Sequence, residues 1–241
     1  MKQIQVNGTN KVIIFDSGSL ISLSLTGLLG ILAELKKVFE GKFIITSEVK
    51  KEIIDTPLNI KRFELEALRA KRLLDDGVVE LPDSVGVGAE EISKKTNEML
   101  DYANSLFRGE KKDIHIFDLG EASCLALSSI LRDRGVMNVV VVDERTTRML
   151  VEKPENLRKF LGKKLHMNIE VQKKNVGAFK GFKIIRSPEL VYVAYKKGFV
   201  KMKGPKVLDA LLYALKFKGA SISGEEIEEM KKIAGRSGMK K

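Results

Sequence analysis

The sequence has few of the residues that build disulfides, soft-metal sites and large aromatic cores. Its 241 residues include one cysteine, two histidines, five prolines and no tryptophan. A single cysteine, Cys124, excludes an intrachain disulfide and any zinc site built on several cysteines. His115 and His166 stand far apart, which argues against a His-rich metal centre. We therefore expect a cytoplasmic protein, and its charge-rich composition is typical of thermophiles.

Long hydrophobic runs are also scarce. Residues 17–33 carry no charge and are rich in Leu and Ile, but they contain four Ser and three Gly. The stretch is shorter than the roughly 20 residues that a membrane span needs. It follows an apolar strand rather than a basic segment with a cleavage site. We predict a buried helix here and no membrane association.

Charge is abundant but unevenly distributed. The chain has 43 Lys and Arg against 32 Asp and Glu, a net charge of +11. Residues 1–150 hold 21 basic and 23 acidic side chains, whereas residues 151–241 hold 22 and 9. Such a surplus indicates an anionic partner, nucleic acid or an acidic membrane surface, and says nothing about fold.

Short apolar β runs alternate with helical segments along the chain. The expected strands are residues 11–15, 43–46, 78–81, 139–142 and 182–186. The helical segments between them include residues 58–76, 89–107 and 118–134. This alternation favours an α/β fold around a mostly parallel sheet. We expect one domain over residues 1–241, with a basic insertion at 153–180, either a hairpin or irregular after residue 166, and C-terminal helices at 188–234.

Acidic residues follow several of the predicted strands. They are Asp16, Glu48 and Glu52, Asp118 and Glu121, and Asp143 and Glu144. In an open α/β sheet, ligands bind beyond the carboxyl ends of the strands, so these acids are expected at one rim. Clustered carboxylates repel one another, and a hard divalent cation relieves that repulsion. With so little His and Cys, Mg²⁺ or Mn²⁺ is the predicted cofactor.

Each of these acids also has a structural explanation. Asp16 and Asp143 can cap the helices that follow them, and Asp118 with Glu121 has the spacing of a capping box. Glu48 and Glu52 lie on one helix face, and either can be a solvated surface charge. The functional prediction rests on the conjunction of four strand-linked acids.

Four motifs in order resemble the PIN-domain nucleases, including the VapC-type toxins. They are Val-Ile-Ile-Phe-Asp16-Ser17, Ile-Ile-Thr-Ser-Glu-Val-Lys-Lys-Glu52, Asp118-Leu-Gly-Glu121-Ala and Val-Val-Val-Val-Asp143-Glu144-Arg145-x-x-Arg148. The resemblance extends over about residues 11–234. The sequence departs from it in Glu144, where Asp is common, and in the long segments 82–112 and 153–180.

The resemblance implies a three-layer α/β/α fold and a Mg²⁺- or Mn²⁺-dependent ribonuclease. Its catalytic, metal-binding acids are Asp16, Glu52, Glu121 and Asp143. Asp118 and Glu144 become auxiliary metal ligands, and Ser17, Arg145 and Arg148 support the site. The family often forms homodimers, and a toxin has an antitoxin-type protein partner.

The basic segment 151–218 holds 17 basic and 5 acidic side chains and is the predicted RNA-binding surface. Candidate phosphate contacts are Lys163, Lys164, Lys173, Lys174, Lys180, Lys183 and Arg186. Phe179, Phe182 and Tyr192 lie among them and can stack on bases or fill the core.

Three other functions compete with a toxin. One is a housekeeping RNA-processing nuclease. Another is a non-catalytic RNA-binding or scaffold protein on a PIN-like fold. A phosphotransferase or phosphatase is disfavoured, because Asp16 lacks a second Asp two residues on and no phosphate-binding loop occurs.

Overall fold

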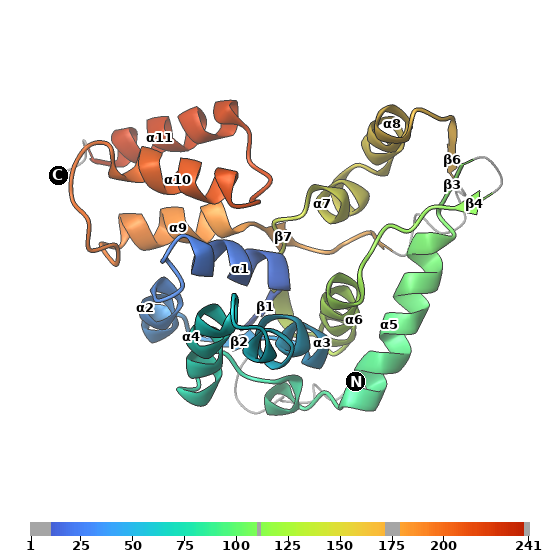
Figure 1. Ribbon diagram of the computed structural model, residues 1–241, viewed down its shortest axis with the longest axis horizontal. Helices are drawn as coiled ribbons and strands as arrows, with labels where there is room; N and C mark the ends of the chain where they lie inside the picture. Colours follow the sequence, from blue (N-terminus) through green and yellow to red (C-terminus); the bar gives the residue numbers. More distant parts are fainter. Residues whose placement is uncertain (1–10, 110–111, 172–178, 239–241) are drawn as a thin grey trace.

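The computed structural model describes residues 11–109, 112–171 and 179–238 (Figure 1). The predicted RNA contacts Lys173 and Lys174 lie outside the described residues. The fold is α/β, as the alternation of strands and helices predicts.

Four parallel strands form the central sheet, in the order β2-β1-β5-β7. They are β1 (Lys11–Phe15), β2 (Lys42–Ile44), β5 (Met137–Val141) and β7 (Ile184–Ile185). Ile14 pairs with both Ile44 and Val140, so β1 is a central strand. Its apolar residues are largely buried, as expected for a strand covered on both faces.

The strand expected at residues 78–81 is reduced to one residue. Glu80 makes a single parallel bridge with Ile44 at the β2 edge of the sheet. Gly77 precedes it with a φ of 67°, and Pro82 follows at the start of the 3₁₀ turn η3 (Pro82–Val85). A left-handed residue and a residue without an N–H confine the pairing to this short stretch.

Helix α6 (Leu119–Asp133) packs against β5 and β1, and α5 (Ala89–Asn104) packs along α6. Helix α9 (Ser187–Lys196) packs on α1 (Ser17–Leu25) and α2 (Ile31–Val38). The remaining N-terminal elements are α3 (Ser47–Lys50), the π-helical turn η1 (Lys51–Asp55), the 3₁₀ turn η2 (Pro57–Asn59) and α4 (Glu64–Asp75).

The uncharged stretch 17–33 is two helices rather than one. Helix α1 ends at Leu25, Gly27 has a φ of 70°, and α2 begins at Ile31. In the described ranges, no helix is both long and apolar enough to cross a bilayer. The sequence pattern missed the turn because Leu25, Leu28 and Leu29 continue the apolar pattern on both sides of Gly27.

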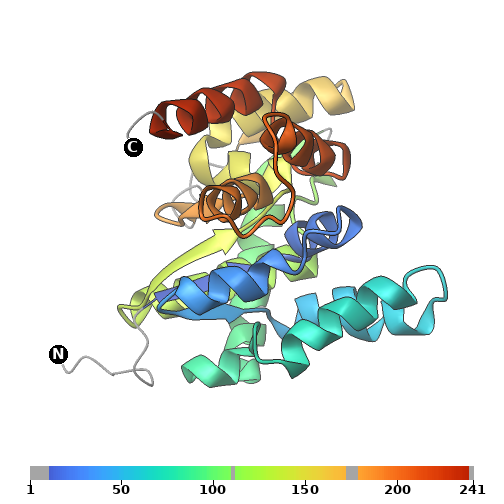
Figure 2. The same ribbon diagram turned by 90° about the vertical axis from the view of Figure 1, so that its left-hand side faces the viewer.

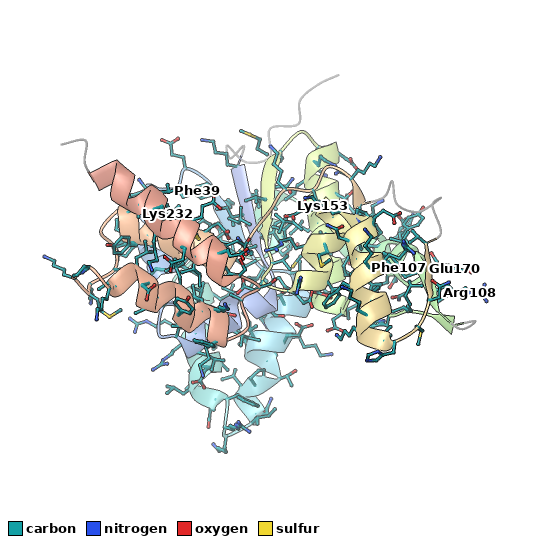
Figure 3. All side chains as sticks on the ribbon, turned by 90° about the horizontal axis from the view of Figure 1, so that it is seen from above. Phe39, Phe107, Arg108, Lys153, Glu170 and Lys232 are labelled. Carbon is teal, nitrogen blue, oxygen red and sulfur yellow. The ribbon has the colours of Figure 1, made fainter. Side chains whose placement is uncertain are left out.

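A second, antiparallel sheet joins two long segments that lie far apart in sequence. Strands β3 (Phe107–Gly109), β4 (Lys112–Asp113) and β6 (Ile169–Val171) form it in the order β4-β3-β6. Arg108 pairs in register with Glu170, and Figure 3 shows these two residues with Phe107 at one end of the molecule. The stretch after residue 166 therefore pairs with β3 where we considered a local hairpin.

Helices α7 (Arg145–Glu152) and α8 (Pro154–Leu165) lead to β6. Helices α10 (Val207–Phe217) and α11 (Gly224–Gly238) follow α9 and enclose a small apolar cluster that includes Leu208, Leu212 and Ile227. Figure 2 shows these red C-terminal helices on the opposite side of the strands from α4.

Candidate functional site

Asp16 lies at the carboxyl end of β1 and is the N-cap of α1. The Gly18 N–H donates to Asp16 Oδ2 at 3.1 Å, so the structural prediction of a helix cap is confirmed. The residue is only 2% exposed, and its Oδ1 atom is buried without a hydrogen-bond partner. Burial, together with the charges of Glu52 and Asp143, raises the pKa of Asp16 to about 7.

Asp143 lies on the neighbouring strand, just beyond the end of β5. The backbone N–H and the hydroxyl of Ser187 donate to its two carboxylate oxygens at 2.7 and 2.6 Å. Burial raises the pKa of Asp143, although the Ser187 hydrogen bonds oppose the rise. Two central parallel strands thus end in buried aspartates whose charges interact, as the position of the acids predicts.

Glu121 comes from the first turn of α6. It accepts the Asp118 N–H at 3.3 Å, which is half of the predicted capping box, and the Thr147 hydroxyl at 2.7 Å. Burial and the charge of Asp16 raise the pKa of Glu121 to about 8, and Glu144 adds to the effect. A single residue therefore both caps its helix and belongs to the acidic cluster.

Glu52 lies in the π-helical turn η1, with both carboxylate oxygens against the Cα of Gly120. A Cβ atom on Gly120 would lie 2.8 Å from each oxygen. The charge of Glu52 also contributes to the raised pKa of Asp16. This geometry favours Glu52 over Glu48 as the acid contributed by the second strand–helix unit.

Gly120→Ala tests whether the position of Glu52 matters. The new methyl group displaces the end of a flexible side chain, while Ala in place of Gly favours the helix by up to about 1 kcal/mol. We expect an unchanged or slightly higher Tm together with at least a tenfold loss of metal-dependent RNA cleavage. Gly30→Ala, where a Cβ meets nothing within 4 Å, is the control. Equal activity of both variants contradicts this assignment of Glu52.

Asp118 and Glu144, the predicted auxiliary ligands, are engaged differently. The Asp118 side chain is 84% exposed and lies 3.4 Å from His115. The Glu144 carboxylate caps α7 by accepting the N–H groups of Thr146 and Thr147. Ser17 begins α1 beside Asp16 and is half-buried.

The two arginines that follow Asp143 have separate surroundings. Arg145 is exposed and lies over the ring of Phe160, at 5.0 Å from its centroid. Arg148 donates to the Ser221 carbonyl at 3.0 Å, and Ser221 donates its N–H to the Asp143 carbonyl at 3.0 Å. Arg148 therefore holds the segment around Ser221, which is itself hydrogen-bonded to the backbone of Asp143.

The four acids Asp16, Glu52, Glu121 and Asp143 bring only oxygen ligands, which suits a hard cation. Asp16 Oδ1 is buried and has no hydrogen-bond partner in the protein, which destabilises the folded state. In the described part of the chain, no three His, Cys, Asp or Glu side chains are positioned to hold a metal ion as they stand. Asp143 and Glu121 are turned instead onto the hydroxyls of Ser187 and Thr147.

The predicted RNA-binding cations that the structure describes have different surroundings. Lys163 and Lys164 are exposed at the end of α8. Lys180 and Lys183 precede β7, so they lie at the opposite end of the strands from Asp143, with Lys183 about 13 Å away along the sheet. Arg186 is 9% exposed and forms ion pairs with Glu189 and Glu226.

Two of the three candidate stacking rings of the basic segment are core residues. Phe179 packs edge-on against Phe117, and Phe182 lies under Arg132. Both are buried, and Tyr192 packs against the apolar cluster of α10 and α11. Of the two alternatives for these rings, filling the core is therefore confirmed for Phe179 and Phe182, which present no face for base stacking.

The residues that sequence reasoning missed are uncharged. Ser187 and Thr147 hold two of the carboxylates, and the Ser123 hydroxyl joins the Gly120 carbonyl to Thr46. Serines and threonines are common in the sequence, so no pattern distinguishes these few. Only Gly120, between Asp118 and Glu121, carried a signal, because Gly is unfavourable inside a helix.

Ser187→Ala tests the support of Asp143. Loss of the hydroxyl removes a hydrogen bond that favours the ionised carboxylate, so the pKa of Asp143 rises further. We expect a loss of roughly 1.5–3 kcal/mol in the free energy of unfolding at about pH 8, measured by urea denaturation. The loss shrinks as the pH is lowered to 4 through the raised pKa of Asp143, because a protonated carboxyl is a weaker acceptor than a carboxylate. The exposed Ser47→Ala is the control, and an equal effect at both pH values contradicts the argument.

Comparisons of the chain with protein-family models, with curated proteins and with solved structures find no match.

Proposed function

We propose that this protein is a Mg²⁺- or Mn²⁺-dependent ribonuclease that hydrolyses RNA phosphodiester bonds at Asp16, Glu52, Glu121 and Asp143. The observation that carries the proposal is Asp16 Oδ1, a buried carboxylate oxygen without a protein partner amid three other acids. The three-layer PIN-like arrangement is part of the same proposal, and a parallel central sheet supports it.

The four acids would hold the cation, which supplies water activation and neutralisation of charge on the phosphate. Asp16 is held by the Gly18 N–H and has one oxygen free for a ligand. Thr147 and Ser187 keep Glu121 and Asp143 in place at the start of α6 and the end of β5. Lys163 and Lys164 on α8 provide positive charge that attracts RNA towards an otherwise repulsive acidic site.

Toxin-like and RNA-processing roles share this chemistry. A toxin arrests growth when expressed alone and requires an antitoxin-type protein partner, whereas a processing enzyme does neither. A homodimer is compatible with both roles. Growth of a host culture after induction, with the Asp16→Asn variant as control, separates the two roles.

A second candidate function is RNA binding without catalysis. The hydrogen bonds of Asp143 and Glu121 favour it, because both carboxylates already have hydroxyl partners within the protein. Such a protein binds RNA without a metal ion and leaves the RNA uncleaved.

Incubation with a mixed panel of single-stranded and structured RNAs tests the proposal. We expect cleavage with Mg²⁺ or Mn²⁺ and none with EDTA. Binding of the panel without cleavage under every metal condition supports the second function and contradicts the first.

A further inference from the structure

A polar cleft lies next to the acidic cluster, between α7 and the connection from α10 to α11. Its volume is about 500 Å³, and Figure 1 shows this connection facing α7. Three cations line it: Arg145, Arg148 and Lys216. Glu144 also lines it and follows Asp143 directly, so the cleft opens beside the proposed reaction centre.

Hydrogen bonds to the Ser221 carbonyl hold one wall of the cleft in place. Arg148 and Arg186 both donate to this oxygen, at 3.0 and 2.8 Å. The Ser221 N–H is bonded to the Asp143 carbonyl. The connection is therefore attached to the same strand end that carries the acid, and the cleft keeps its place relative to Asp143.

Both acids of the cleft accept hydrogen bonds within the protein, and one of them, Glu226, is also paired with a cation. Glu144 accepts the first N–H groups of α7, and Glu226 pairs with Arg186 and accepts the Ser223 N–H. Arg145 and Lys216, in contrast, lie over the rings of Phe160 and Tyr213. Among the described residues, neither of these two forms an ion pair, whereas Arg148 pairs with Glu152 at 3.8 Å. Arg145 and Lys216 together outweigh the one acid without a cationic partner, Glu144, so the cleft has a net positive charge, which favours an anion.

We propose that this cleft binds a phosphate of single-stranded RNA next to the bond that is cut, with Arg145 and Lys216 as the phosphate-binding residues. This inference rests on the proposed function for the class of substrate. A volume of about 500 Å³ accommodates a nucleotide-sized group, whereas a duplex cannot enter it. Arg148, which holds Ser221, is a positioning residue.

RNA binding is measured in the Asp16→Asn background, in which cleavage does not interfere. A fluorescent single-stranded RNA reports affinity for this background and for the same protein with Arg145→Ala and Lys216→Ala. We expect the double substitution to weaken binding roughly 10- to 100-fold. We also expect the slope of log K against log salt to become shallower by about 0.7 for each phosphate that the protein no longer neutralises.

Lys71→Ala with Arg72→Ala is the matched control, because it removes the same two residue types from the exposed face of α4. We expect it to change the affinity by less than about twofold. Inorganic phosphate is the second probe: it should compete with RNA in the background protein and lose this effect when Arg145 and Lys216 are replaced. A duplex of the same sequence should bind with no dependence on these two residues.

Equal weakening by the two double substitutions overturns the cleft proposal, even if the protein cleaves RNA. Equal dependence of duplex and single strand on Arg145 and Lys216 also overturns it. If no metal supports cleavage but Arg145 and Lys216 still control binding, the cleft proposal stands and the ribonuclease proposal fails.

Discussion

Asp16→Asn should abolish metal-dependent RNA cleavage, with a loss of at least about 10³-fold in kcat. The substitution keeps the size of the side chain and an oxygen that can accept the Gly18 N–H. It removes the negative charge from one of the two most buried acids of the cluster, at which a divalent cation would bind. A loss of about 4 kcal/mol in transition-state stabilisation corresponds to this factor. Initial rates with Mg²⁺ and with Mn²⁺ provide the measurement.

Asp133→Asn is the matched control. Asp133 is exposed at the C-terminal end of α6, at the opposite end of the helix from Glu121. We expect it to retain the normal rate. Circular dichroism of both variants separates loss of the site from loss of the fold. An active Asp16→Asn protein with metal present means that the reaction centre has been assigned to the wrong residues.

The metal-free protein should lose stability as the pH rises from about 4 to about 8. The pKa of Asp16 is raised to about 7 and that of Glu121 to about 8, both above their unfolded values. Between the unfolded and folded pKa values the folded state binds more protons than the unfolded state. The free energy of unfolding therefore falls across this window, by up to roughly 4 kcal/mol for each carboxyl considered alone. Urea denaturation at a series of pH values, in EDTA, measures it.

Substitution of either acid and addition of metal should each reduce this pH dependence. Asp16→Asn and Glu121→Gln lack the group that titrates, so their stability at pH 8 should exceed that of the native chain. Mn²⁺ or Mg²⁺ should raise the Tm of the native chain at pH 8 and have a much smaller effect on Asp16→Asn. A native chain that is more stable at pH 8 than at pH 5 without metal contradicts the picture of a strained acidic cluster.

The two predictions also separate the two candidate functions. In a ribonuclease, a bound cation relieves the repulsion between the clustered acids. Catalysis and the stabilisation by metal therefore disappear together in Asp16→Asn. An RNA-binding protein without catalysis retains the pH dependence, which arises from burial and repulsion alone. It shows no increase in Tm with metal. Both outcomes are readable from the same set of denaturation curves.

Local sequence was sufficient for the elements whose chemistry is local. The apolar run 11–15 forms β1, Asp16 caps α1, and Glu121 makes the capping contact with the backbone of Asp118. The parallel direction of the strands follows from the alternation of strands with helices, so that Asp16 and Asp143 were expected at the same edge of the sheet. These features depend on residue spacing, which a sequence displays directly.

Long-range contacts decided the rest. Residues 107–109 and 169–171 pair in one sheet although they are about 60 residues apart, and no local pattern indicates such a partner. Lys183 and Arg186 are close in sequence, yet one is exposed at the far end of the sheet and the other is buried between two carboxylates. Ser187 reaches Asp143 across 44 positions.

Residue types and their order therefore established which acids are available and at which strand ends they lie. Tertiary packing alone decided which carboxylates accept hydrogen bonds from hydroxyls, which buried carboxylate oxygen stays without a partner, and where cations remain without an acidic partner. The physical reason is that burial, charge repulsion and hydrogen bonding act between neighbours in space, and most of these neighbours are distant in the chain.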